Sequence, residues 1–308
     1  MKEAHFSGSI LVISKNRILL NHGYGYADRQ KGIANTPRSL FGLASIQKSL
    51  TALMIFQQIK TGKISLDTTL DHYYPLLPDA KQITIHHLLT MSSGLLSSNR
   101  AIPRQVSDDD YILPAIEGAE QKYPLGSWHY SPVNYKILAG ILQTVTGKTY
   151  SENFDQTFGK KFAFVSYKKF SSERYRTLSY YDLSERKPAG YDTKIMSNEI
   201  ATGNVFTTCS NLYLYFRDLL TGGLLPPELV DQMFSTFGRS PYSCGVYPNR
   251  DYVRAHGYIF KYEPSIIISR NGQDAVIMLA NAPVKGSWQR YAQEFYRELT
   301  FTNKIVKQ

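Results

Sequence analysis

The sequence predicts an α+β protein whose antiparallel sheet is built from both ends of the chain, flanked by helices and interrupted by a helical insertion. Residues 6–13 and 17–23 have strand composition and enclose the turn Lys15-Asn16, so the chain opens with a hairpin. Strand composition returns between residues 252 and 280, after a long stretch of helical patterns. The two strand-rich ends are therefore expected to share one sheet.

The segments between the two ends carry apolar residues at helical spacing. They cover residues 45–62, 63–77, 83–91 and 134–145. Gly62 and Gly147 are expected to stop the first and the last of these helices. Residues 160–200, rich in Tyr, Lys and Ser, show no clean period.

The last third of the chain returns to strands. Residues 252–260, 265–269 and 275–280 are the expected strands, and Asn271-Gly272 is a two-residue hairpin turn between the last two. Residues 288–299 form a final helix. We expect residues 1–62 and 205–308 to form an α/β part and residues 63–204 a mainly helical part, with the active site between them.

Composition narrows the class of protein. The 308 residues are 43% hydrophobic, enough for a large core, and contain no run long enough to span a membrane. The net charge of +10 is spread along the chain without a nucleic-acid motif, so an anionic cell-envelope polymer is a better expected partner than nucleic acid. Cys209 and Cys244 are far apart and are expected to be ordinary thiols, and neither a metal nor a cofactor is expected.

The start of the chain carries no apolar signal region. We therefore expect either a cytoplasmic protein or an extracellular or envelope-associated one whose leader or anchor lies outside this sequence.

Ser45 and Lys48 are the main candidate catalytic residues. They open an amphipathic run, and a spacing of three places both side chains on one helix face. A lysine amine beside a serine hydroxyl can take its proton and activate it as a nucleophile. The same spacing at Ser166 to Lys169 and at Ser184 to Lys187 lies in polar, Tyr-rich stretches that are expected to be loops.

Five stretches, one of which contains this motif, make up a resemblance that covers nearly the whole chain. They are residues 23–28, 40–48, 62–67, 83–95 and 130–135. Together they resemble the serine β-lactamase and penicillin-binding-protein superfamily, in the branch that holds class C β-lactamases, D-Ala-D-Ala carboxypeptidases and related esterases. The resemblance implies a β-lactamase/transpeptidase-like fold and a serine hydrolase.

The family has three active-site elements, and this chain departs from two of them. Ser45 and Lys48 match the first element. Tyr130 matches the tyrosine of a Tyr-x-Asn element, but Pro132 replaces its asparagine. His256-Gly257 is the best match to the third, a Lys/His-Thr/Ser-Gly stretch on an edge strand, with two possible registers one residue apart.

Three literal motif copies are interpreted as unrelated to the site. Residues 60–62, a Lys-Thr-Gly, lie twelve residues beyond Lys48 and are expected to end the helix. Residues 247–249, a Tyr-x-Asn, are expected to form a turn, and residues 97–99, a Ser-x-Asn, a loop.

The resemblance implies a role for each matching residue. Ser45 would be the nucleophile, and Lys48 and Tyr130 would share its proton as base and then acid. The N–H of Ser45 and one near Gly257 and Tyr258 would form the oxyanion hole. His256 would orient a substrate carboxylate or polarise Tyr130.

Pro132 affects which substrate is expected, because proline has neither a side-chain amide nor a backbone N–H that could donate a hydrogen bond to the substrate. Efficient β-lactam turnover is thus less expected than hydrolysis of D-alanyl peptides or esters of the cell envelope. Two alternatives stay open: a broad-specificity esterase or weak β-lactamase, and a non-catalytic sensor that binds muropeptides or β-lactams.

Overall fold

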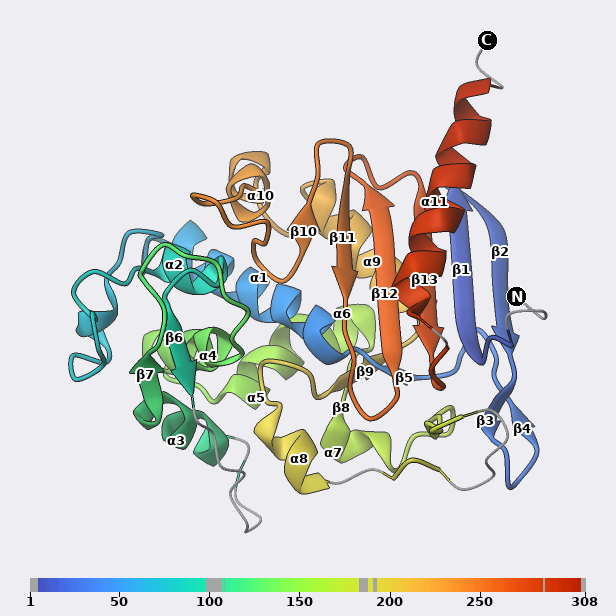
Figure 1. The fold of residues 1–308 in the computed structure, drawn as a ribbon, viewed down its shortest axis with the longest axis horizontal. Helices are drawn as coiled ribbons and strands as arrows, with labels where there is room; N and C mark the ends of the chain where they lie inside the picture. The colour runs from blue at the N-terminus through green and yellow to red at the C-terminus, as the bar shows by residue number, and fades with distance from the viewer. Residues whose placement is uncertain are drawn as a thin grey trace.

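The computed structural model describes residues 5–97, 107, 109–182, 188–190, 193–284 and 286–305. Its main sheet has six antiparallel strands in the order β10-β11-β12-β13-β1-β2 (Figure 1). The strands are β1 (Gly8–Ser14), β2 (Arg17–Tyr24), β10 (Tyr247–Pro248), β11 (Tyr252–His256), β12 (Glu263–Ser269) and β13 (Ala275–Ala280). The first strand pairs with β13 from Gly8↔Ala280 to Ile13↔Ala275, which confirms the predicted sheet built from both termini.

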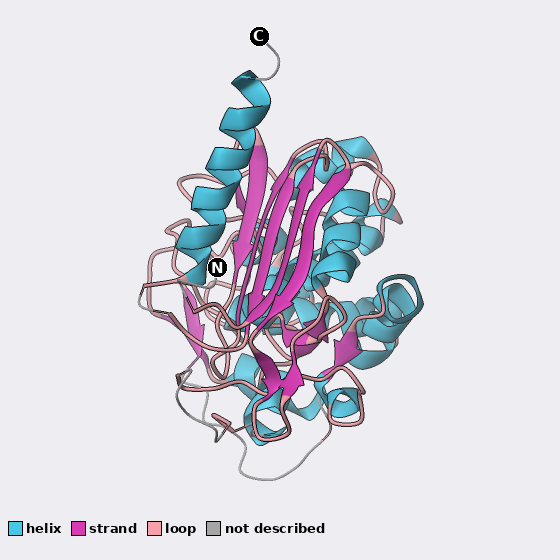
Figure 2. Cartoon of the chain, turned by 90° about the vertical axis from the view of Figure 1, so that its right-hand side faces the viewer, coloured by secondary structure: helices cyan, strands magenta, loops and turns pink. Residues whose placement is uncertain are grey.

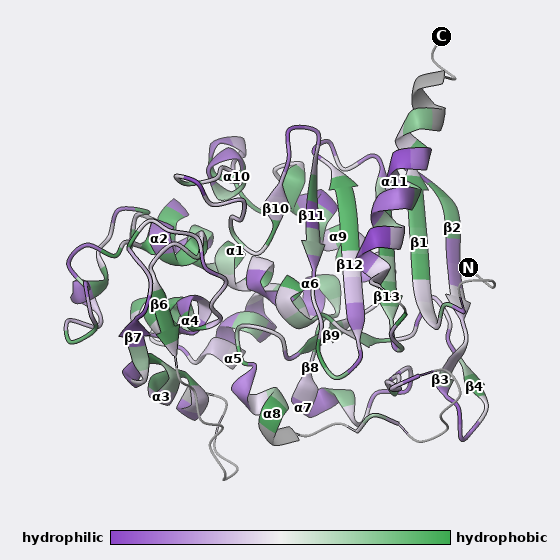
Figure 3. Cartoon of the chain, viewed as in Figure 1, coloured by the Kyte–Doolittle hydropathy of each residue, from purple (hydrophilic) through white to green (hydrophobic). Residues whose placement is uncertain are grey.

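Helices cover both faces of this sheet (Figure 2). The C-terminal helix α11 (Trp288–Ile305) lies on one face and packs on Ile267 and Met278. The neighbouring side chains Ile266 and Ile268 point to the other face, into the large core shared with α1 (Gln47–Lys60) and α9 (Cys209–Leu220). Successive side chains of a strand alternate between faces, and both faces are covered, so β12 and β13 are buried along their whole length. β13 is apolar throughout, whereas β12 is hydrophilic at its start and apolar in its middle (Figure 3).

The other elements lie between β2 and β10 in the sequence. The short strands and the single 3₁₀ or π turns are β3 (Tyr26–Asp28), β4 (Ile33–Ala34), β5 (Phe41–Gly42), η1 (Ala44–Ile46), η2 (Leu70–His72), β6 (Leu95–Ser97), η3 (Asp109–Tyr111), β7 (Ala119–Gln121), η4 (Asp155–Gly159), β8 (Val165–Ser166) and β9 (Val205–Thr207). The remaining helices are α2 (Ile85–Leu89), α3 (Ile112–Glu117), α4 (Val133–Thr146), α5 (Tyr150–Phe154), α6 (Lys160–Phe162), α7 (Tyr167–Phe170), α8 (Thr193–Asn198) and α10 (Pro227–Met233). The predicted division into parts at residues 62/63 and 204/205 stays a prediction.

The structure corrects several local predictions. The stretch from Ser166 to Lys169 is not a loop, because β8 pairs with β9 and leads directly into α7. Residues 247–249 are not simply a turn, because Tyr247 and Pro248 pair with β11 as a two-residue edge strand. The predicted strand 252–260 ends at His256, and the final helix continues beyond residue 299 to Ile305.

Other local predictions are confirmed. Residues 60–62 do end α1, where Gly62 adopts a φ of +71°. Cys209 and Cys244 are free and buried, and burial raises the pKa of the Cys244 thiol to about 12. The predicted loop at residues 97–99 is not confirmed, because Ser97 ends β6 and Ser98 and Asn99 lie outside the described residues. The motif copy at Ser184 to Lys187 also lies outside them.

The outer strand β2 is an exposed edge of the sheet. Ile18 and Leu19 on it are 63% and 61% exposed. The pairing with β1 shifts by one residue between Val12 and Ile13, which leaves Leu19 as an extra residue in a β-bulge. Across the described part of the chain, no helix is both long and apolar enough to cross a bilayer.

Trp288 anchors α11 to the sheet, and its removal should destabilise the fold. Its side chain is fully buried and packs edge-on against Phe6, with the two ring centroids 4.8 Å apart. The indole Nε1 donates a hydrogen bond to the Ala282 carbonyl at 2.8 Å. Trp288→Ala should lower the free energy of unfolding by about 3–5 kcal/mol in urea titrations. Phe301→Ala, on the same helix at a 63% exposed position, should change it by about 0.5 kcal/mol or less. Equal losses in the two variants would contradict this role.

Candidate active site

Ser45 and Lys48 meet where a 3₁₀ turn becomes a helix. Ser45 lies in η1, and Lys48 lies one turn later in the first turn of α1. The Nζ atom of Lys48 lies 3.1 Å from Ser45 Oγ and donates to the Thr202 carbonyl at 3.0 Å. Because Lys48 is only 1% exposed, its amine is held in one place beside the serine.

Tyr130 reaches the same serine from the helical part of the chain. It lies just before α4, and its hydroxyl is 2.5 Å from Ser45 Oγ. The Lys48 amine lies 5.3 Å from the centre of the Tyr130 ring, and Tyr242 packs against that ring edge-on at 5.9 Å. The structure therefore brings three of the predicted residues into direct contact from separate elements, with Tyr130 39% exposed to solvent.

Gly257 passes against the backbone of Ser45. A Cβ atom built on Gly257 would lie 2.7 Å from the Ser45 nitrogen and 2.7 Å from Ala44 Cβ, so only glycine fits there. The N–H groups of Gly257 and Ile259 donate to Pro264 and Tyr262. Because successive N–H groups of an extended chain point in opposite directions, the N–H of Tyr258 faces away from that partner segment. It is thus a candidate oxyanion donor together with the N–H of Ser45.

From this close approach we infer one of the two possible registers of the third motif, which stays a prediction. Gly257 takes the place of the motif glycine, which puts His256 at its Thr/Ser position and Ala255 at its Lys/His position. Ala255 is buried in the core shared with α1, as alternation along β11 requires. In this register the motif would have no polar side chain at its Lys/His position, and in the other register His256 would hold that position.

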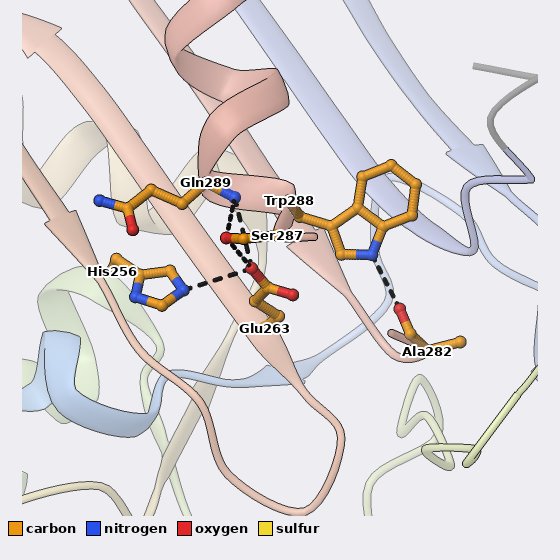
Figure 4. A network of polar contacts seen from close by, with 6 residues as sticks. All are labelled: His256, Glu263, Ala282, Ser287, Trp288 and Gln289. Atoms are coloured by element: carbon orange, nitrogen blue, oxygen red, sulfur yellow. Dashed lines mark hydrogen bonds and ion pairs between the residues drawn. The ribbon is translucent and has the colours of Figure 1, made fainter. Parts of the chain in front are cut away.

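His256 is the predicted catalytic residue that the structure does not bring to Ser45. Its side chain points to the opposite face of the sheet, where Nε2 lies 3.3 Å from Glu263 Oε1 (Figure 4). The same carboxylate oxygen accepts from Ser287 Oγ at 2.6 Å and from the N–H of Gln289 at 3.3 Å. Burial acts to raise the pKa of Glu263, but hydrogen bonds from His256 and Ser287 outweigh it and leave the pKa lowered. Glu263 is therefore the polar partner of His256 in the structure, and the expected role of His256 beside Tyr130 or a substrate carboxylate stays a prediction.

Pro132 starts α4 and lines a small cavity beside the site. Its φ of −56° suits the helix start. The cavity, of about 300 Å³, is also lined by Ser131, Lys136 and Glu199. The amide that the family places at residue 132 is missing, and the Lys48 amine is held instead by the carbonyl of Thr202.

Three residues of this region are not among those predicted from the sequence: Lys136, Glu199 and Thr202. Lys136 carries the only charge of α4, in an otherwise apolar run, and this signal could have identified it. Thr202 contributes a backbone carbonyl, which leaves no trace in the residue type. Within the described ranges, no three His, Cys, Asp or Glu side chains gather closely enough to hold a metal ion.

A serine hydroxyl between a buried lysine amine and a tyrosine, with two N–H groups beside it, defines a site for serine acyl transfer. The sequence profile of the Beta-lactamase family matches residues 1–266, and the chain belongs to this family.

Two curated proteins are similar to this chain over nearly its whole length. The putative penicillin-binding protein PbpX of Bacillus subtilis (strain 168) is 29% identical over 287 residues, covering 91% of this chain and 72% of that protein. A teichoic acid D-alanine hydrolase of Staphylococcus aureus (strain MRSA252) is 26% identical over 317 residues, covering 99% of this chain and 77% of the relative.

Solved structures share the fold. FmtA from Staphylococcus aureus superposes with a TM-score of 0.83 at 22% identity, covering 97% of this chain and 86% of that one. The D-amino acid amidase from Ochrobactrum anthropi SV3, complexed with L-phenylalanine amide, gives 0.77 at 18% identity, covering 97% and 95%. These neighbours confirm the predicted β-lactamase/transpeptidase-like fold.

Adding one methyl group at Gly257 should damage the site. In Gly257→Ala the new Cβ would collide with the Ser45 backbone, so the serine and its N–H must shift. We expect acylation by a fluorescent penicillin to slow by about 100-fold, as for the loss of one oxyanion donor. Gly159→Ala is the matched control, because its new Cβ would meet nothing closer than 4.0 Å. Stopped-flow acylation rates of folded variants test this, and an unchanged rate in Gly257→Ala would contradict the proposed oxyanion geometry.

Proposed function

We propose that this protein is a serine hydrolase that forms an acyl-enzyme at Ser45 and acts on D-alanyl groups of the bacterial cell envelope. The observation that carries the proposal is the contact of Ser45 Oγ with both Lys48 and Tyr130. The similarity to a teichoic acid D-alanine hydrolase supports a D-alanyl ester as the substrate.

The proposed reaction has two halves. Ser45 Oγ attacks the D-alanyl carbonyl carbon while Lys48 takes its proton, and the N–H groups of Ser45 and Tyr258 stabilise the oxyanion. Tyr130 donates a proton to the leaving alcohol oxygen as the ester bond breaks, and Lys48 returns its proton to Tyr130. Water then attacks the acyl-enzyme and releases D-alanine, with the same groups moving protons in reverse.

A basic cavity on the face of the sheet opposite to Ser45 also fits an ester substrate carried on an anionic polymer. A cavity of about 350 Å³ on the α11 face of β11 is lined by Tyr247, Arg254, His256 and Arg290 among others. Among the described residues, no acidic side chain lines it, and the chain as a whole carries a net charge of +10. We propose that this cavity, and not proton transfer, is where His256 contributes, and that the protein works at the cell envelope.

The absence of an asparagine at Pro132 favours a second candidate function, that of a sensor which is acylated but turns over slowly. Both functions share the nucleophile, and they differ in the lifetime of the adduct. A penicillin adduct that persists for hours without D-alanyl ester hydrolysis would favour the sensor.

Ser45→Ala should abolish covalent labelling by a fluorescent penicillin and reduce ester hydrolysis to the background rate. The reason is that no other hydroxyl contacts both Lys48 and Tyr130 in the described structure. Intact mass spectrometry of wild type, Ser45→Ala and the control Ser166→Ala checks this. If the adduct survives in Ser45→Ala but is lost in Ser166→Ala, our proposal names the wrong nucleophile.

Removing a positive charge from the cavity on the α11 face of β11 should weaken binding of an anionic polymer and leave binding of a small ester unchanged. For Arg290→Gln we expect KM for D-alanylated lipoteichoic acid to rise about 3-fold at low salt, and the difference should shrink as salt screens the charge. KM for p-nitrophenyl acetate should stay unchanged. Arg17→Gln, an exposed arginine on β2, is the control. Equal effects of Arg290→Gln on both substrates would count against polymer binding here.

A further inference from the structure

A second buried lysine lies beside the site, and the proposed reaction does not use it. Lys136, in the first turn of α4, is only 4% exposed. It lines the 300 Å³ cavity together with Pro132 and Glu199. A buried ammonium is costly unless a charge of opposite sign lies near it. Of the residues that the structure describes around this cavity, Glu199 is the acidic one.

Glu199 is linked to Lys48 through a single residue. Its Oε2 atom accepts from Thr202 Oγ1 at 2.7 Å, and its carbonyl accepts from the N–H of Thr202 at 3.0 Å. The Thr202 carbonyl in turn accepts from Lys48 Nζ at 3.0 Å. The Glu199 carboxylate thus fixes the turn that holds the catalytic-site lysine.

The charges of this group act on one another. Burial lowers the pKa of Lys136 to about 8, Glu199 acts in the opposite direction, and Lys48 lowers it further. Lys136 and Lys48 are therefore close enough for their charges to interact. Ser45 and Tyr130 contact Lys48 directly, Lys136 faces it from α4, and Glu199 with Thr202 faces it from the segment after α8. The residue that follows β11, Gly257, lies against Ser45 and carries no charge.

We propose that Lys136 and Glu199 are positioning residues for Lys48: Glu199 holds the Thr202 carbonyl against the amine, and the charge of Lys136 offsets that of Glu199. This proposal rests on the proposed roles of Ser45 and Lys48. Without Lys136, the carboxylate of Glu199 would stand without an opposite charge close to the amine that takes the serine proton. The pair supports the lysine where Pro132 has removed the family's amide.

The pH dependence of ester hydrolysis tests the proposal. For p-nitrophenyl acetate, Lys136→Met should move the acidic limb of kcat/KM upward by about 1 pH unit, which lowers the rate on that limb about 10-fold. The double variant Lys136→Met/Glu199→Gln should move the limb back toward wild type. It removes both charges, while the amide oxygen of Gln can still accept from Thr202 Oγ1.

Two controls separate charge from packing. Lys122→Met removes a surface lysine whose side chain is 52% exposed and should leave the limb in place. Circular dichroism should show that each variant is folded. A fall in rate at all pH values without movement of the limb, or no recovery in the double variant, would overturn the proposal. Activity that persists in Ser45→Ala would instead refute the proposed function itself.

Discussion

The close approach of Gly257 to the backbone of Ser45 is the constraint on which the site depends. It brings the segment that follows β11 against η1, so the start of α1 lies directly beside this end of the sheet. Ala44 adopts a φ of +45° at this junction, a strained conformation that costs about 1–3 kcal/mol and persists only where packing enforces it. Leu43 and Ala44 are buried, and Gly203 lies against Ala44 from the other side.

Much of the fold and half of the site follow from local patterns. The opening hairpin, the end of α1 at Gly62 and the Ser45–Lys48 spacing depend on neighbouring residues, so composition and period predict them. His256 shows the limit, because a shift of one residue reverses the face to which a strand side chain points. Tyr247 and Pro248 show it too, since only pairing with a distant strand makes them extended. Thr202 acts through its backbone, which no residue type records.

The site combines a conventional nucleophile with an altered support. Ser45, Lys48 and Tyr130 make the contacts that acyl transfer requires, but the groups around them differ from the family pattern at Pro132 and, in the inferred register, at Ala255. Both departures remove a polar side chain close to where substrate would bind. The charges of the region lie further out, at Lys136 and Glu199 on one side and at Arg254 and Arg290 on the other. Such an arrangement suits a substrate recognised over a longer distance than a compact β-lactam.

The bulge between β1 and β2 has a consequence for how copies of this protein behave at high concentration. An open strand edge with two protruding aliphatic side chains, Ile18 and Leu19, is a template on which another chain could add a strand. The extra residue twists this edge and interrupts the regular spacing of its free N–H and C=O groups. The hydrogen-bonding groups of a second copy would therefore not match those of this edge. This mismatch disfavours fibril-like stacking through the sheet that supports the site.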